Sequence, residues 1–115
     1  MIAVIFEVEP KQGQLDAYLE IAADLKPELE KIDGFLSVER FTSLTTPGKY
    51  LSLSFWRDEA ALTEWRNRPR HRHAQHTGRH EMFAGYRLRV AGVMRDYGLT
   101  DRDEAPADAI DKSGV

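Results

Sequence analysis

The chain contains no cysteine, which excludes disulfide bonds and thiolate chemistry. No apolar run approaches the roughly 20 residues that a membrane-spanning helix needs. The first ten residues have acidic side chains inside their apolar run and no basic residue before it. This pattern predicts a first strand and not a signal peptide. We therefore expect a cytoplasmic protein with no membrane segment.

Several catalytic motifs are absent as well. The sequence has no glycine-rich phosphate loop, no serine on a strand-to-helix elbow and no carboxylate pair in an apolar setting. A net charge of −3 does not indicate a nucleic-acid partner. At 115 residues, with 42% apolar and 30% charged side chains, the composition is typical of one globular domain.

All four histidines lie within one basic segment, residues 65–80. They stand at positions 71, 73, 76 and 80, among five arginines and without an acidic residue. Histidine titrates near neutral pH, transfers protons and binds metals, so this segment is the first place to look for function. In a helix, His76 and His80 would have the spacing at which two imidazoles can share a metal. No cysteine is present to complete a zinc site, and we expect no metal.

Apolar periodicity predicts elements in the order β-α-β-β-α-β. Strands are expected at residues 2–8, 35–44, 49–56 and 86–97, and helices at about 15–32 and from Asp58 to about Phe83. Pro27 predicts a kink or a second short helix, and Pro69 an interruption. Short connections favour an α+β, ferredoxin-like fold, with a four-stranded antiparallel sheet and both helices on one face. We expect a single domain over residues 1–98, followed by an acidic tail over residues 99–115.

The other face of that sheet would be left bare. Aromatic side chains are expected there, namely Trp56, Tyr50, and Phe41 or Phe35. An exposed apolar patch indicates a partner, so the sequence predicts a homodimer packed sheet face against sheet face. Three arginines of the last strand are expected to pair across that dimer with Glu7 or Glu39, namely Arg87, Arg89 and Arg95.

Five stretches of the sequence carry a family resemblance: IAVIFEVEP, IDGFLSVERF, LSLSFWRDEAALTEWRN, PRHRHAQHTGR and GYRLRVAGVMRDYG. They span residues 2 to about 98 and are similar to the antibiotic biosynthesis monooxygenase domain of the dimeric α/β-barrel superfamily. The resemblance implies a dimeric α/β barrel. The activities it implies are diverse, because the family includes cofactor-free polyketide oxygenases, haem-degrading monooxygenases and a quinol oxygenase.

Residues of the better-understood family members carry over only in part. Haem-degrading members use an asparagine on the first strand, a tryptophan on the second helix and a histidine ten residues beyond it. Trp65 matches the tryptophan, whereas Phe6 stands near the place of the asparagine and Gln75 at the place of the histidine. Cofactor-free members also depend on asparagine, and Asn67 is the only asparagine in this chain.

The first functional hypothesis is a cofactor-independent oxygenase acting on a small aromatic or quinone-like molecule. His71 or His76 would remove a phenolic proton, so that the substrate reacts with O2 directly. Trp65 and Trp56 would form apolar walls. Two further residues are candidates for binding the substrate. Arg79 would contact an anionic group of the substrate, and Tyr86 would donate a hydrogen bond to a substrate carbonyl.

The sequence is also compatible with two other functions. One is a haem-binding and haem-degrading monooxygenase with His76 or His71 as axial ligand. Another is a dimer that binds a small molecule without catalysis. The single residues also have structural interpretations: Trp65 and Trp56 as core, His71 as a structural hydrogen-bonding group, Arg79 as part of a dimer salt bridge, and the other histidines as solvated side chains.

Overall fold

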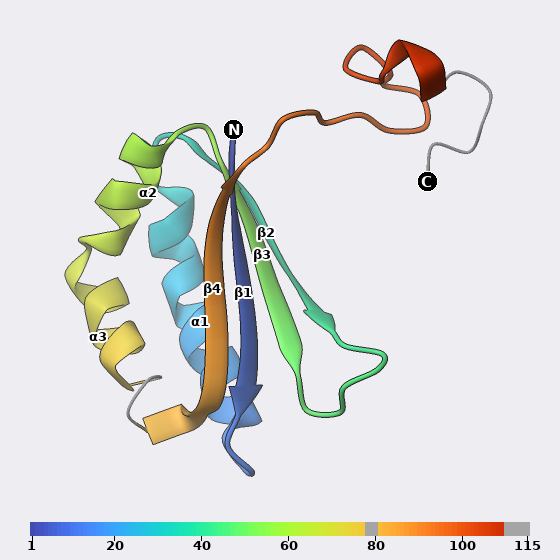
Figure 1. Cartoon of the computed structure of the whole chain (residues 1–115). Coiled ribbons are helices and arrows are strands. Elements are labelled where there is room, and N and C mark those ends of the chain that lie inside the picture. Colours follow the sequence, from blue (N-terminus) through green and yellow to red (C-terminus); the bar gives the residue numbers. More distant parts are fainter. Residues whose placement is uncertain (78–80, 110–115) are drawn as a thin grey trace.

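The structure is a computed structural model that describes residues 1–77 and 81–109. Its elements are β1 (Ile2–Pro10), α1 (Leu15–Glu30), β2 (Phe35–Thr42), β3 (Tyr50–Trp56), α2 (Glu59–Arg66), α3 (Pro69–Thr77), β4 (Phe83–Gly92) and a short 3-10 helix (Ala107–Ala109) (Figure 1). The strands form one antiparallel sheet in the order β2-β3-β1-β4. This arrangement confirms the predicted ferredoxin-like α+β fold.

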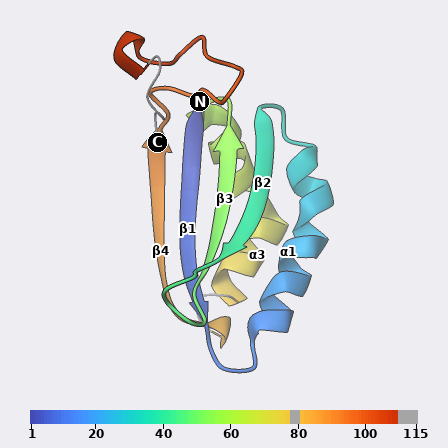
Figure 2. The ribbon, with the colours of Figure 1, turned by 90° about the vertical axis from the view of Figure 1, so that its right-hand side faces the viewer.

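All three α-helices lie on one side of the sheet (Figure 1). Figure 2 looks onto the opposite face, where the strands lie in front and the helices behind. Two clusters of buried side chains fill the inner side. The larger contains Leu29, Ile32, Trp56, Ala61 and Trp65, and the smaller contains Val8, Tyr18 and Met82. They lie toward opposite ends of the sheet, because Trp56 pairs with Ile2 at the start of β1 whereas Val8 pairs with Tyr50 near its end.

The outcome of the sequence prediction differs between the two prolines. Helix α1 runs through Pro27 to Glu30 without a second helix, and Leu29, in the turn after the proline, is buried in the larger cluster. We attribute the continuity to this packing. The interruption predicted at Pro69 is confirmed: α2 ends at Arg66 and Pro69 begins α3, at a position where its missing N–H has no helical partner to lose. Helix α2 starts as predicted, since the Asp58 carboxylate accepts a hydrogen bond from the Ala61 N–H at 2.9 Å.

Other element bounds also shift. Helix α3 ends at Thr77, and β4 runs over Phe83–Gly92, three residues earlier at its start and five earlier at its end than expected. After β4 the chain leaves the body of the domain (Figure 1). Met94 and Leu99 in this stretch are 86% and 94% exposed. None of the helices in the described ranges combines the length and apolarity needed to cross a membrane.

The assignment of Trp56 and Tyr50 to the bare face is wrong, and of the alternatives Phe41 and Phe35 only Phe41 lies there. Trp56 is only 1% exposed and belongs to the larger cluster, against which Phe35 packs, while Tyr50 packs against the smaller one. Phe41 alone lies on the bare face, and it is 43% exposed. Both faces of β3 carry large apolar side chains, so alternation separates the faces without telling which one the helices cover.

The bare face carries the alternate residues of the central strands. On β1 this is Ile5, and on β3 these are Leu51, Leu53 and Phe55, which alternate with the helix-facing Trp56. Ile5 pairs directly with Leu53 in the β1–β3 register. This surface is therefore apolar at its centre.

An ion cluster borders this apolar face. Arg89 contacts the Glu7 carboxylate, and Lys49 lies 3.0 Å from the same side chain. These contacts lower the pKa of Glu7 below its usual value, with the hydrogen bond from Lys49 as the largest cause. The pairing of Arg89 with Glu7 that we expected between two copies is thus made within one chain.

Candidate functional site

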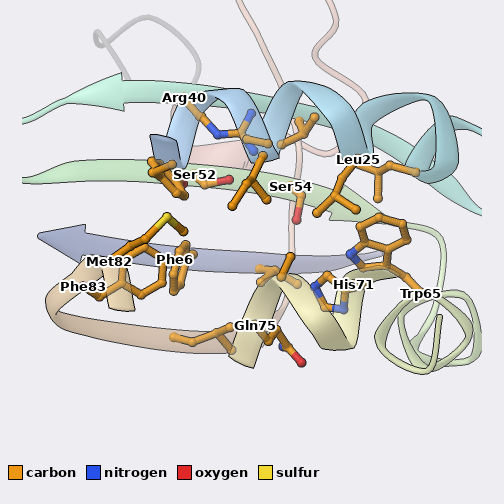
Figure 3. A pocket seen from close by; sticks show the side chains of 18 of the residues that line it. Phe6, Leu25, Arg40, Ser52, Ser54, Trp65, His71, Gln75, Met82 and Phe83 are labelled. Atoms are coloured by element: carbon orange, nitrogen blue, oxygen red, sulfur yellow. The ribbon is translucent and has the colours of Figure 1, made fainter. Parts of the chain in front are cut away.

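A cavity of about 190 Å³ lies between the inner face of the sheet and helices α1 and α3 (Figure 3). Its wall is mostly apolar, with side chains from the two buried clusters. The polar side chains on the wall are Tyr18, Arg40, Ser52, Ser54, His71 and Gln75. Small-molecule sites are usually enclosures of this kind, apolar with a few placed polar groups.

Helix α3 presents one face to the cavity. His71, Ala74 and Gln75 line it, at the i, i+3 and i+4 positions that share a helix face. His73 and His76 are exposed and do not line this cavity. The structure therefore places His71 at the cavity and His76 away from it. The other two candidates of this segment, Arg79 and His80, lie outside the described residues.

His71 is the chemically distinctive group of the cavity. Its ring lies 4.6 Å from the Trp65 ring, centroid to centroid, with 36° between the planes. Its Nδ1 is buried and has no hydrogen-bond partner among the described residues. Burial lowers the pKa of His71 below its ordinary value of 6.5, and the backbone carbonyl of Arg66 opposes this shift. The imidazole is therefore mainly neutral at pH 7, and one of its nitrogens can accept a proton.

Both tryptophans are core residues and cavity walls at once. Trp65 is 7% exposed and Trp56 1% exposed, and each lines the cavity. The Trp56 Nε1–H donates to the Ser54 hydroxyl at 3.0 Å, and the Phe35 ring packs against the indole at 5.3 Å, edge to face. For Trp65 and Trp56, the interpretation as core residues and the interpretation as cavity walls are therefore compatible.

Tyr86 lies beside the cavity and does not line it. It is 48% exposed and packs against Phe6 and Phe83, with ring centroids 5.7 and 6.1 Å away. Those two phenylalanines do line the cavity. Tyr86 is therefore separated from the cavity by one layer of aromatic side chains.

Several wall residues were missed by the sequence reasoning. Arg40 and Gln75 were not selected, and neither were Ser52 and Ser54. A signal existed for the serines, because alternation places them on the same face of β3 as Trp56. The described residues contain no group of three or more His, Asp or Glu positioned to hold a metal ion.

The sequence model of the antibiotic biosynthesis monooxygenase family matches residues 1–77. The chain belongs to this family. The matched segment includes every polar wall residue of the cavity named above, from Tyr18 to Gln75. The family assignment therefore covers the candidate site itself.

Similar proteins agree with this assignment. A protein of Pyricularia oryzae named jasmonate monooxygenase ABM is 52% identical over 93 residues, which cover 81% of this chain and 43% of that protein. The chain thus spans less than half the length of this curated relative. Among solved structures, a Mycobacterium tuberculosis protein has a TM-score of 0.75 at 18% identity, covering 84% of this chain and 98% of its own. A putative antibiotic biosynthesis monooxygenase from Deinococcus radiodurans has a TM-score of 0.74 at 13% identity. The match covers 86% of this chain and 98% of that protein.

Proposed function

We propose that this family member is a monooxygenase that works without a bound cofactor on a small, mostly apolar ring compound held in the cavity. One observation carries the proposal: a half-buried, mainly neutral His71 lines a mostly apolar cavity, and its buried Nδ1 has no hydrogen-bond partner among the described residues. Buried polar atoms without a partner are rare, and one in a side chain on a cavity wall suggests that a ligand supplies the partner. The family assignment and the relative's name support the oxygenase class.

His71 acts in this proposal as a general base. It takes a proton from an acidic O–H or C–H group of a phenol- or quinol-like substrate, and the resulting anion transfers electrons to O2. A ring CH2 group then becomes a carbonyl: one oxygen atom enters the product and the other leaves as water with the two hydrogens. The substrate supplies all four electrons, so the reaction needs no external reductant.

The size of the cavity supports the cofactor-independent proposal over the haem alternative. At about 190 Å³ it is smaller than most small-molecule sites, which measure about 300–1,000 Å³, and a porphyrin is a large ligand. The histidines near the cavity are also poorly placed to act as a haem ligand. His71 faces the cavity but stacks on Trp65, and His76 does not line it.

Oxygen uptake tests the proposal directly. The compounds to supply first are phenols and quinols with an activated ring position, and jasmonate because of the relative's name. We expect O2 consumption at one O2 per product, and with ¹⁸O2 one labelled atom in the product and the other in water. Ligand-dependent thermal stabilisation without O2 uptake would establish the non-catalytic alternative. A Soret band on titration with haem would contradict cofactor independence.

We also propose that the bare sheet face is covered by a second copy of the chain. The apolar side chains at its centre, Ile5, Leu53 and Phe55, need a partner surface, and burial in a symmetric dimer supplies one. Light scattering at micromolar concentration should give twice the 13.1 kDa mass of one chain.

A variant makes this test specific. Leu53→Arg places a charge at the centre of the face, opposite Ile5, and should return the mass of a single chain. Circular dichroism must show an unchanged fold for this result to count. Wild-type protein that scatters as one chain contradicts the dimer.

A further inference from the structure

Among the described arginines, Arg40 is the one that lines the cavity. Its side chain lines the cavity from the inner face of β2, and its guanidinium carbon lies 5.9 Å from the centroid of the Tyr18 ring. No described carboxylate lies within ion-pair distance of it. Arg57, Arg68 and Arg70, in contrast, each pair with an acidic side chain.

The surroundings of Arg40 leave its charge uncompensated. Of the described residues that line the cavity, none is Asp or Glu, and His71 is mainly neutral at pH 7. Arg40 is therefore the side chain that gives this apolar cavity a formal charge. A guanidinium next to low-dielectric walls attracts an anion more strongly than one in open water.

Two serine hydroxyl groups lie on the same wall of the cavity as this charge. Ser52 is directly opposite Arg40 in the β2–β3 register, and Ser54 follows two residues along the same face. Both line the cavity. The Ser54 oxygen already accepts the Trp56 Nε1–H, which leaves its own hydrogen available to donate. An anion beside Arg40 would thus meet hydroxyl donors as well as the guanidinium.

We infer that Arg40, assisted by Ser52, binds the carboxylate of the substrate, so that the protein selects small apolar carboxylic acids. Figure 3 shows Arg40 and Ser52 toward one end of the cavity and His71 with Trp65 toward the other. From Ser52 to Trp56 the strand advances by about 13 Å. A substrate anchored at Arg40 therefore extends its apolar body along the wall and brings its far end to His71.

The choice of arginine is informative. A guanidinium can grip both oxygens of a carboxylate through two parallel hydrogen bonds, which fixes the direction of the bound molecule. Lysine offers a point charge without that geometry. Arg40 is exposed in the empty protein, so water can solvate its charge until the anion arrives.

Binding of an acid and its ester tests this inference. We would measure the affinity for jasmonate and for methyl jasmonate by calorimetry in the absence of O2, so that no turnover interferes. Wild-type protein should prefer the acid by about 10-fold or more, as expected for charge-assisted hydrogen bonds. Arg40→Gln should remove that preference, and Arg40→Lys should keep part of it.

The matched control is Arg66→Gln, which changes the net charge equally at an exposed position of α2 that does not line the cavity. It should keep the preference for the acid. The inference is overturned if the ester binds wild-type protein as well as the acid does, if neither binds, or if Arg40→Gln leaves acid binding unchanged. Circular dichroism on each variant confirms that the fold is retained.

The inference rests on the proposed cavity function, yet the two can fail separately. An acid preference that depends on Arg40, together with no O2 uptake, would support the carboxylate site and reject the oxygenase. The opposite result is O2 uptake on neutral phenols, unchanged in Arg40→Gln, together with equal binding of acid and ester. It would support the oxygenase and reject the carboxylate site.

Discussion

Replacing His71 by glutamine is expected to lower the turnover number about 10²–10⁴-fold, the range that general-base catalysis supplies. Glutamine retains a polar group of similar length but cannot take up a proton at neutral pH. The stack on Trp65 is the structural contribution that the substitution also removes. Initial rates of O2 uptake at saturating substrate measure the effect, with thermal unfolding recorded in parallel.

The pH profile separates a catalytic role from a structural one. Burial lowers the pKa of His71 below 6.5, and a general base must be deprotonated to work. The wild-type rate should therefore be flat above pH 7 and fall on the acid side, below pH 6.5, as the imidazole takes up a proton. In the His71→Gln variant this acid limb should be missing from the residual activity.

Two neighbouring histidines on the same helix provide matched controls. His73→Gln and His76→Gln change the same functional group at exposed positions that do not line the cavity. Both variants should keep activity within about twofold of wild type, because surface substitutions of this kind have small effects. A large loss in His76→Gln with normal activity in His71→Gln would move the catalytic role to His76.

Replacing Trp56 by alanine should reduce the free energy of unfolding by about 3–5 kcal/mol, the usual cost of deleting a large buried aromatic side chain. Trp56 is 1% exposed, contacts Phe35 edge to face and donates a hydrogen bond to Ser54. Domains of this size have about 5–15 kcal/mol of stability in total. Urea unfolding followed by far-UV circular dichroism measures the loss without relying on tryptophan emission.

The gentler variant Trp56→Phe keeps this prediction measurable if the alanine variant does not fold. It retains most of the ring volume and loses the Nε1–H, so its destabilisation should be clearly smaller than that of alanine. Leu44→Ala is the control, because Leu44 is fully exposed and its loss should change stability by no more than about 0.5 kcal/mol. Equal effects of Trp56→Ala and Leu44→Ala would contradict the placement of Trp56 in the core.

The sequence alone was sufficient for the order of elements and for the family. Alternation along residues 49–56 and periodicity along 15–32 are local properties, and local properties decide strand or helix wherever the pattern is strong. The bounds were less certain around the prolines. Pro27 sits inside α1 because packing of Leu29 holds the following turn, which is a tertiary effect that no local rule contains.

The sequence predicted only part of the candidate site. The concentration of histidines directed attention to the segment that holds His71, and the match at Trp65 added its stacking neighbour. Which histidine faces the cavity depends on the rotation of α3 about its axis, and packing against α1 and α2 sets that rotation. Arg40 was overlooked because nothing in the sequence near it differs from an ordinary surface strand.

By itself, the sequence determined the chemical inventory of this protein: no thiol, one histidine-rich basic segment, two tryptophans and the alternating strands of a ferredoxin-like domain. Only the tertiary structure decided which face of the sheet is covered, which histidine lines the cavity, and that Arg40 shares the cavity with it. The physical reason is that burial and charge environment depend on residues far apart in the chain. Arg40 and His71 come together through the sheet and helix α3, not through any local pattern.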